Sequence, residues 1–569
     1  MQDSKIRVNA PKDPQKLRSF FYVMTDTVVC GNDLGDGVIN DKIFLDNHVL
    51  VKKAEDFGGI TDESILELLG SSEGFHKLVH SIGITLESDQ VEQVMFELRM
   101  YGRKERFESG TRLRVACNCD GSEQILSIQD YKVTEEDVVP GFFEFGFHEA
   151  GQTAKASIRF YLNDGYAAPV VDIDPPVDFK SESYGKMIEK SLLHMGNVKR
   201  IQDAVQRAEL GEEITIAYIG GSITEGAGAK PSNKECYAYK SFSAFHELCG
   251  ESSKVNYIKA GVGGTPSEFG MVRYERDVLK ENTVSPDIVV VEFAVNDADD
   301  ETEGNCFESL VYRILSAPNH PAVVLLFSVF VNDWNLQDRL APIGLKYDLP
   351  MVSVKDAVVE QFSKEREHGN VITKRQFFYD IYHPTNDGHI IMADCLTNLF
   401  KKALQEKPSE VDIDLQQPPV IGRDFVNIRL ADRTNLLEGM VIEEGSFADS
   451  DKDLQKADYD ADPTFVPIFP NNWMHSAENG DEPLHIRVKC KSFVLVYKDS
   501  GTDEFGKACV HVDGNAARIL NPHDVGWTHC HATILFKEEK EDWHDISIRM
   551  EAEDERKRFT VLGFGIVNE

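Results

Sequence analysis

Apolar and polar residues follow three different patterns along the chain, and each pattern predicts a different architecture. Up to residue 175, apolar and polar positions alternate in short runs, for example in residues 91–102, 112–119 and 155–165. Alternation with a period of two, interrupted by turn residues, is typical of antiparallel β-strands. We therefore expect a β-rich accessory domain in residues 1–175. Residues 172–186 form a polar segment with a Pro-Pro pair, and we predict that this segment is the linker to the next domain.

From residue 185 to residue 407, near-continuous apolar runs alternate with helical patterns. The helical patterns include residues 236–250 and, as the last helix, residues 387–404. Apolar strands separated by helices are typical of a parallel sheet that is covered by helices on both faces. We expect an α/β domain in residues 185–407, with right-handed crossovers between its strands. The five predicted strands are residues 214–221, 254–264, 286–297, 321–332 and 349–354.

Short alternating runs return after residue 415. They occupy residues 485–501, 507–514, 531–539 and 559–567, with turn residues between them. This pattern predicts a second β domain, of the sandwich or jelly-roll type, in residues 415–569.

Composition argues against two classes of partner, nucleic acids and membranes. The 569 residues include 60 Lys and Arg against 96 Asp and Glu, a net charge of −36, so the chain lacks the basic surface that nucleic acids and anionic membranes attract. The longest mainly apolar run, Ala322–Val331, has about half of the roughly 20 residues that a membrane-spanning helix needs. We expect neither nucleic-acid nor membrane partners.

Cysteine usage and the N-terminus favour a cytoplasmic protein. The ten cysteines include no CxxC pair, which is typical of free thiols in a reducing compartment. The apolar stretch Phe20–Cys30 is interrupted by Thr25, Asp26 and Thr27, and the residues before it lack the basic start and apolar core of a signal peptide.

Chemically active residues follow the predicted central strands at the points where these strands end. Ser222 follows the first strand, Gly264 the second and Asn296 the third, while Asp380 and His383 stand just before the last helix. Ligands of open α/β sheets bind outside the carboxyl ends of the strands. We expect these five residues to meet at one edge of the sheet.

Each of these residue types has a role in acyl transfer. Ser222 is the candidate nucleophile, His383 the base that activates it, and Asp380 the carboxylate that orients the imidazole. The backbone N–H groups of Ser222 and Gly264 and the side-chain amide of Asn296 would form the oxyanion hole. A serine alone is more often a helix cap, so the prediction depends on the whole set.

In sequence, these segments resemble the four blocks of the SGNH (GDSL-type) hydrolase superfamily. The blocks are Gly-Gly-Ser-Ile-Thr at 220–224, Ala-Gly-Val-Gly-Gly-Thr at 260–265, Ala-Val-Asn-Asp at 294–297 and Asp-Ile-Tyr-His-Pro at 380–384. The third block departs from the family pattern, because Val295 stands where glycine is usual. The resemblance implies a flavodoxin-like, three-layer α/β/α core, here flanked by N- and C-terminal β-sandwich (jelly-roll-like) domains.

The combination of this core with β domains resembles bacterial carbohydrate O-acetylesterases of the acetyl xylan or mannan esterase type. The resemblance implies a serine esterase, a carboxylic ester hydrolase, that removes O-acetyl groups from oligosaccharides derived from plant xylan or mannan. It implies an acetylated oligosaccharide as partner and no cofactor. A lipase-like or thioesterase-like acyl hydrolase and a non-catalytic carbohydrate-binding protein stay open as alternatives, as do the glycan, the acetyl position and homo-oligomer formation.

For three tryptophans and two polar clusters, the sequence gives less specific predictions of function. Trp334, Trp473 and Trp527 are candidates for stacking on sugar rings, although a single tryptophan is more often a core or interface residue. His529 and His531 share one strand face, but no third ligand is evident, so we predict no metal site. The acidic stretch 449–453 lacks the glycine and glutamate of a calcium loop, and we predict a solvated loop.

Overall fold

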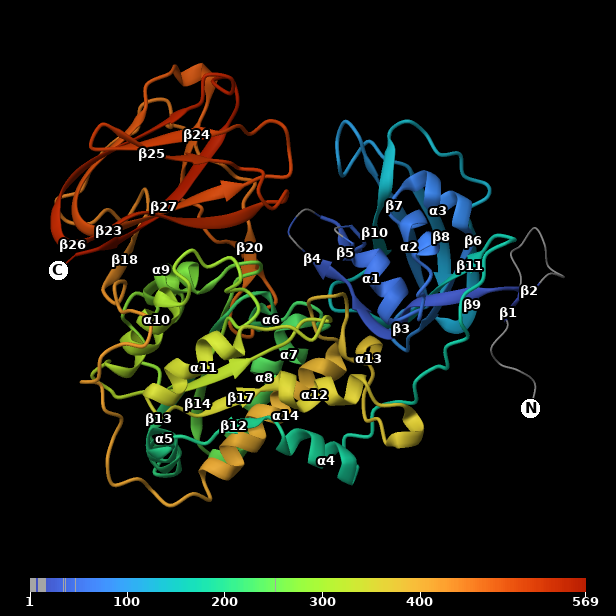
Figure 1. Ribbon diagram of the computed structural model, residues 1–569, viewed down its shortest axis with the longest axis horizontal. Helices are drawn as coiled ribbons and strands as arrows, with labels where there is room; N and C mark the ends of the chain where they lie inside the picture. The colour runs from blue at the N-terminus through green and yellow to red at the C-terminus, as the bar shows by residue number, and fades with distance from the viewer. Residues whose placement is uncertain are drawn as a thin grey trace.

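The protein consists of three units that pack against one another (Figure 1). The structure, a computed structural model, describes residues 7–8, 17–33, 35, 37–46, 48–250 and 252–568. Figure 1 shows an N-terminal unit in blue (residues 17–162), a central unit from green to yellow (residues 182–404) and a C-terminal unit in orange and red (residues 425–568). The two outer units lie next to each other on the same side of the central unit.

The central unit is built on a six-stranded sheet in which five strands are parallel. The parallel strands follow the order β14-β13-β15-β16-β17, which is the strand order of a doubly wound, flavodoxin-like sheet. This sheet confirms the α/β fold and the five strands that the apolar runs predict. In spatial order the strands are β12 (Leu192–His194, antiparallel to β17), β17 (Met351–Ser353), β16 (Ala322–Phe327), β15 (Ile288–Glu292), β13 (Glu213–Gly220) and β14 (Lys254–Gly261).

Helices cover both faces of this sheet, because its strands are apolar on both sides. One face packs on α4 (Glu182–Glu189), α5 (Lys199–Glu209), α8 (Tyr237–Cys249), α12 (Val354–Phe362) and α14 (Asn386–Ala403). The other face packs on α9 (Ser267–Asp277), α10 (Asn305–Leu315) and α11 (Gln337–Lys346). Short helices in the loops are α6 (Ser222–Glu225), α7 (Ser232–Glu235), α13 (Lys374–Phe377) and the 3-10 helix η1 (Arg366–His368).

The N-terminal unit contains two antiparallel sheets and three helices around one core. Its β character agrees with the alternating pattern, and the stretch Phe20–Cys30 is a strand of it. The first sheet contains β4 (Asn32–Asp33), β5 (Ile39–Phe44), β10 (Asp137–Gly146), β7 (Gln93–Gly102) and β8 (Arg112–Asn118). The second contains β3 (Phe20–Cys30), β11 (Thr153–Leu162), β6 (Val79–Glu87) and β9 (Asp120–Ser127). The helices are α1 (Val49–Asp56), α2 (Glu63–Leu68) and α3 (Ser72–Leu78). A separate pair of short strands consists of β1 (Arg7–Val8) and β2 (Leu17–Arg18).

The C-terminal unit is one eight-stranded antiparallel sheet with two long strands. These are β23 (Leu484–Asp499) and β26 (His529–Met550), whose pairing shifts in register between Cys490 and Val494. The other strands of this sheet are β18 (Ile428–Ala431), β19 (Val441–Glu443), β22 (Trp473–His475), β24 (Ala508–Val512), β25 (Asn515–Leu520) and β27 (Phe559–Val567). A separate ribbon of β20 (Lys456–Asp458) and β21 (Phe465–Pro467) and the 3-10 helix η2 (Ala477–Asn479) complete the unit.

Strand β23 contributes alternate side chains to two different cores. Phe493 and Leu495 point into the core of the C-terminal unit itself. Val494 and Val496 belong instead to the apolar cluster that also contains residues of α9, α10 and the central sheet. Since side chains of a strand alternate between its two faces, the C-terminal sheet lies directly on the helix layer of the central unit and shares its apolar core.

Two segments differ from their sequence predictions. The linker of residues 172–186 is irregular only up to its last residues, because α4 begins at Glu182, and its Asp174 is buried against Arg375. The acidic stretch 449–453 is not simply solvated. Asp451 is 7 % exposed and lies 3.0 Å from the Lys498 ammonium, because the sheet brings β23 alongside this stretch.

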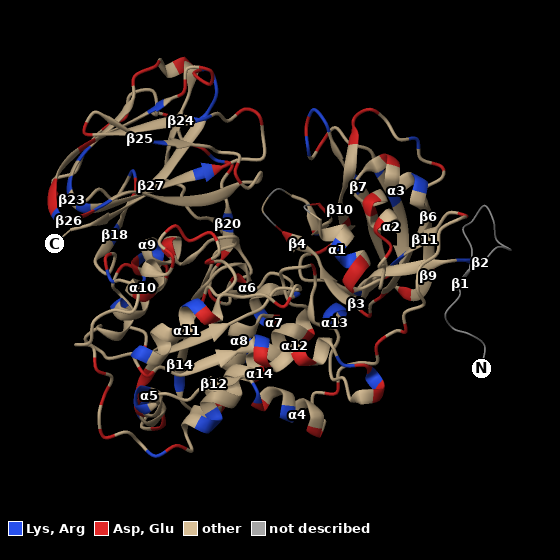
Figure 2. Ribbon diagram, viewed as in Figure 1, with Lys and Arg blue, Asp and Glu red and all other residues tan. Residues whose placement is uncertain are grey.

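Charge is distributed over the whole molecule. Figure 2 shows Asp and Glu in all three units, interspersed with Lys and Arg. Among the described residues, no helix is both long and apolar enough to cross a lipid bilayer. All ten cysteines have free thiols.

A buried ion pair joins the C-terminal unit to the central sheet and predicts a stability effect. Lys259 of β14 and Asp458 of β20 are fully buried, with Nζ and Oδ1 2.8 Å apart. Asp458→Ala leaves the ammonium of Lys259 without this partner, so the free energy of unfolding falls by about 3–5 kcal/mol, measured by urea unfolding. The control Asp503→Ala removes an exposed carboxylate and changes stability by less than about 0.5 kcal/mol. Equal losses in both variants would contradict this prediction.

Candidate active site

Ser222, His383 and Asp380 form one hydrogen-bonded array. Ser222 is the first residue of α6, directly after β13, and the other two residues lie in the loop before α14. His383 Nε2 lies 2.9 Å from Ser222 Oγ, and His383 Nδ1 lies 2.7 Å from Asp380 Oδ2. Because a carboxylate only accepts hydrogen bonds, Nδ1 carries the hydrogen and Nε2 is left to accept the serine hydroxyl. The structure thus brings together all three residues that the sequence predicts for nucleophile, base and orienting carboxylate.

The environment of Asp380 keeps its carboxyl group ionised. Burial raises the pKa of Asp380, but the adjacent His383 and two backbone N–H groups outweigh burial and hold this pKa below its usual value. The N–H groups are those of Tyr382 and His383, which donate to Oδ1 over 2.7 and 2.8 Å. An ionised Asp380 can stabilise the imidazolium that forms when His383 takes a proton.

A lysine of the N-terminal unit supports the loop that carries Asp380. Lys53 of α1 is buried, and its ammonium donates to the carbonyl oxygen of Tyr379 over 2.7 Å. Burial lowers the pKa of Lys53 to about 8, and the nearby charge of Asp380 opposes that shift. No local sequence signal points to this lysine, because it lies more than 300 positions before the residue it contacts.

The predicted oxyanion-hole residues gather around Ser222. A Cβ atom placed on Gly221 would lie 2.2 Å from Asn296 Oδ1, so the Asn296 amide sits directly against the residue before Ser222. A Cβ atom placed on Gly263 would lie 3.8 Å from the Cβ of Ser222, so the turn that contains Gly264 is beside the serine. Gly264 has φ +70°, a left-handed conformation that favours glycine.

Glu225 is a titratable group near the serine that the sequence reasoning did not single out. Its Oε2 would lie 3.1 Å from a Cβ atom placed on Gly263. Burial raises the pKa of Glu225 to about 8, and the charge of Asp458 adds to this effect, while Lys259 and the Gly263 N–H oppose it. Its signal was available in the sequence, because it ends the segment Ser-Ile-Thr-Glu that begins with the nucleophile.

The three tryptophans predicted to stack on sugars differ in burial and in surroundings. Trp473 is 1 % exposed and packs on Phe564, so it is a core residue and not a stacking surface. Trp334 stacks on Phe330 with ring centroids 6.2 Å apart, and Phe330 contacts Tyr382 edge to face. Since Tyr382 precedes His383, this aromatic group lies next to the base.

Trp527 lies against the glycine turn that contains Gly264. Its ring would lie 2.9 Å from a Cβ atom placed on Gly264, and 39 % of the residue is exposed. Its ring also contacts that of His529, with centroids 4.8 Å apart.

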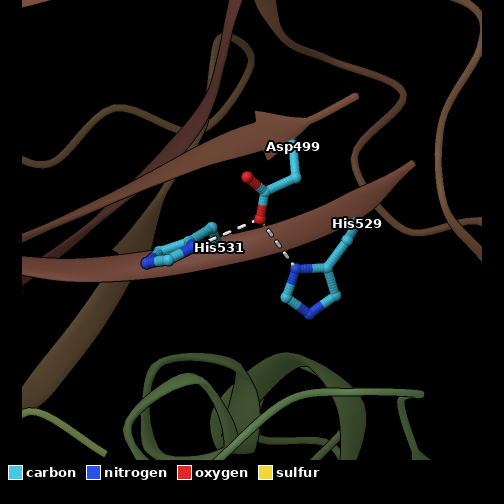
Figure 3. Close-up of side chains that lie close together, drawn as sticks. All are labelled: Asp499, His529 and His531. Atoms are coloured by element: carbon cyan, nitrogen blue, oxygen red, sulfur yellow. Dashed lines mark hydrogen bonds and ion pairs between the residues drawn. The ribbon is translucent and has the colours of Figure 1, made fainter. Parts of the chain in front are cut away.

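The two histidines on one strand face have a third partner that the sequence did not reveal. Asp499 of β23 lies between His529 and His531, and its Oδ2 is 3.1 Å from Nδ1 of each (Figure 3). The expectation that no third potential ligand exists is therefore wrong, because the antiparallel pairing of β23 with β26 places Asp499 opposite His529. Two imidazole N–H groups that donate to one carboxylate explain the cluster without a metal ion.

Comparisons with known proteins show a likeness to ester hydrolases. Residues 218–391 match the GDSL-like Lipase/Acylhydrolase family. A two-domain esterase active on acetylated mannans is 25 % identical, with a TM-score of 0.57, and the match covers 67 % of this chain and 98 % of that chain. Its structure co-crystallised with mannopentaose is 26 % identical over the same shares, with a TM-score of 0.56. Among curated proteins, none matches the sequence.

The family match includes Ser222, Asp380 and His383, and the structural match extends well beyond the central unit. The array of these residues is the arrangement by which acyl hydrolases activate a serine. The chain is therefore a carboxylic ester hydrolase whose central unit matches the GDSL-like lipase/acylhydrolase family model over residues 218–391.

Proposed function

We propose that this esterase removes O-acetyl groups from acetylated oligosaccharides of the mannan or xylan type. The observation that carries the proposal is the likeness to an esterase active on acetylated mannans, because it extends over 98 % of that chain. Mannan-type substrates are therefore favoured over xylan. The sequence predicts a cytoplasmic location. In that location the natural substrates would be imported oligosaccharides.

In the proposed reaction, Ser222 forms an acetyl-enzyme. His383 Nε2 takes the proton of Ser222 Oγ as this oxygen attacks the acetyl carbonyl carbon. The resulting oxyanion accepts hydrogen bonds from Ser222 N–H, Gly264 N–H and the Asn296 amide, each worth about 3–4 kcal/mol in the transition state. His383 then protonates the sugar oxygen as the ester bond breaks. Water, deprotonated by His383, attacks the acetyl group, and acetate leaves while Ser222 regains its proton.

Exposed and half-buried aromatic rings near the serine support a sugar substrate. Trp334 and Tyr382 lie on the His383 side, and Trp527 lies on the Gly264 side. Aromatic rings offer flat apolar faces against which the C–H faces of a pyranose can pack. The net charge of −36 also disfavours acidic glycans through repulsion and leaves neutral glycans unaffected.

The role of Ser222 can be tested without knowing the glycan. Ser222→Ala removes the attacking oxygen, so hydrolysis of p-nitrophenyl acetate falls at least about a thousandfold. Initial rates of purified wild type and variant measure this loss, with circular dichroism to verify folding. An unchanged rate would exclude Ser222 as the nucleophile.

Substrate class can be read from mass loss. Acetylated manno-, xylo- and chito-oligosaccharides are incubated with the enzyme, and each acetyl group removed lowers the mass by about 42 Da. We expect the fastest loss from manno-oligosaccharides. Hydrolysis confined to p-nitrophenyl esters of longer fatty acids would instead favour a lipase-like activity.

Because Trp334 belongs to the aromatic group beside His383 and is not part of the hydrogen-bonded array, we expect its removal to weaken glycan binding without changing the hydrolysis step. Trp334→Ala removes a stacking face worth about 0.5–1.5 kcal/mol, so KM for acetylated manno-oligosaccharides rises about two- to tenfold while kcat on p-nitrophenyl acetate stays unchanged. The control is Trp543→Ala, which removes a tryptophan that is 46 % exposed and stacks on Arg487 instead. The same KM for both variants would remove Trp334 from the sugar site.

A further inference from the structure

The glycine turn beside Ser222 is held by side chains of the C-terminal unit. Gln455 Nε2 donates to the carbonyl oxygen of Gly263 over 2.8 Å. This carbonyl and the N–H of Gly264 belong to one planar trans peptide unit, in which C=O and N–H point in opposite directions. A hydrogen bond that fixes the carbonyl therefore also fixes the direction of the Gly264 N–H, the donor that we assign to the oxyanion.

Gln455 is itself fixed in one orientation. Its Oε1 accepts the backbone N–H of Cys530 over 2.8 Å, and the residue is 9 % exposed. A peptide N–H can only donate and a peptide carbonyl can only accept, so the amide oxygen must face Cys530 and the amide nitrogen must face Gly263. The side chain thus connects β26 rigidly to the turn.

A second contact fixes the next peptide unit of the same turn. His529 Nε2 lies 3.0 Å from the carbonyl oxygen of Gly264. The other ring nitrogen of His529 lies 3.1 Å from Asp499 Oδ2, as Figure 3 shows. Asp499 Oδ2 and the carbonyl oxygen of Gly264 both accept hydrogen bonds, so both ring nitrogens of His529 donate when the two bonds are formed. The bond to Asp499 fixes the direction in which the His529 ring faces the turn. Burial raises the pKa of Asp499, but hydrogen bonds from both histidines outweigh burial and keep this pKa low.

The turn depends on such outside contacts because of its composition. Gly263 and Gly264 have no side chains of their own, and the left-handed φ of Gly264 is open to glycine with little restriction. An oxyanion hole is effective only when its donors are oriented before the reaction.

We propose that Gln455 and the Asp499–His529 pair are positioning residues for the esterase reaction, which orient the Gly264 N–H toward the oxyanion. The C-terminal unit then completes the active site of the central unit as well as covering it. This inference rests on the proposed role of Gly264 and is independent of the identity of the glycan.

The test uses the full-length protein and p-nitrophenyl acetate. His529→Phe and Gln455→Leu remove the two donors with little change in volume, and Gln455→Glu keeps the contact to Cys530 while removing the donor to Gly263. We expect kcat to fall about 10- to 100-fold in each, less than the 10²–10³-fold typical of losing an oxyanion donor outright. KM should change less than about threefold, because the ground-state ester makes little use of this donor.

The matched control is His531→Phe. His531 bonds the same oxygen of Asp499 but is not the residue that bonds the glycine turn, so its loss should leave kcat within about twofold of wild type. His529→Gln can still donate to Gly264 and should recover part of the rate.

A second measurement distinguishes a loss of oxyanion stabilisation from a loss of folded protein. The rate at which diethyl p-nitrophenyl phosphate modifies Ser222 also depends on the oxyanion donors, and it should fall in parallel with kcat in variants whose melting temperature equals that of His531→Phe. The proposal fails if folded His529→Phe and Gln455→Glu keep wild-type kcat. A wrong mannan assignment would give a different result. The wild-type enzyme would then fail to deacetylate manno-oligosaccharides, while the variants would still lose kcat on p-nitrophenyl acetate.

Discussion

The architecture depends on the face-to-face packing of the C-terminal sheet on the helix layer of the central unit. Val494 and Val496 of β23 enter the core formed by α9 and α10, while Phe493 and Leu495 point into the core of their own unit. One strand therefore belongs to two cores at once. The C-terminal unit cannot be removed without exposing apolar surface of the central unit, and the two form one structural body.

This packing decides which residues reach the catalytic loops. It places β26 and the segment before β20 directly over the turn that follows β14, so that Gln455 and His529 contact backbone carbonyls beside Ser222. On the other side, Lys53 of the N-terminal unit contacts the loop that holds Asp380. Each outer unit thus holds a different loop of the site. Loops of the central unit carry the candidate catalytic side chains, and the outer units contact the backbone around them.

Sequence reasoning succeeded where the signal is local. Near-continuous apolar runs predict the five parallel strands, and the residues after each run predict the site, because parallel strands end at the same edge. It failed where partners come from distant segments. The sequence does not separate Trp473 from the other two candidate stacking tryptophans, and only the packing of β22 on β27 shows that it is buried. Nothing in the sequence indicated partners for Asp451 and Asp499. Their partners, Lys498 and His529, come close only when β23, β26 and the preceding loops pack together.

The sequence by itself therefore determined the α/β class of the central unit and pointed to Ser222, Asp380 and His383 as the candidate catalytic residues, since both depend on residue type and short spacing. Tertiary structure alone decided how the site is held. The orientation of the Gly264 N–H depends on hydrogen bonds from residues almost 200 positions or more away, Gln455 and His529, and glycines carry no side-chain signal that would predict such partners. Contacts of this kind are set by which surfaces pack together, and no local pattern encodes them.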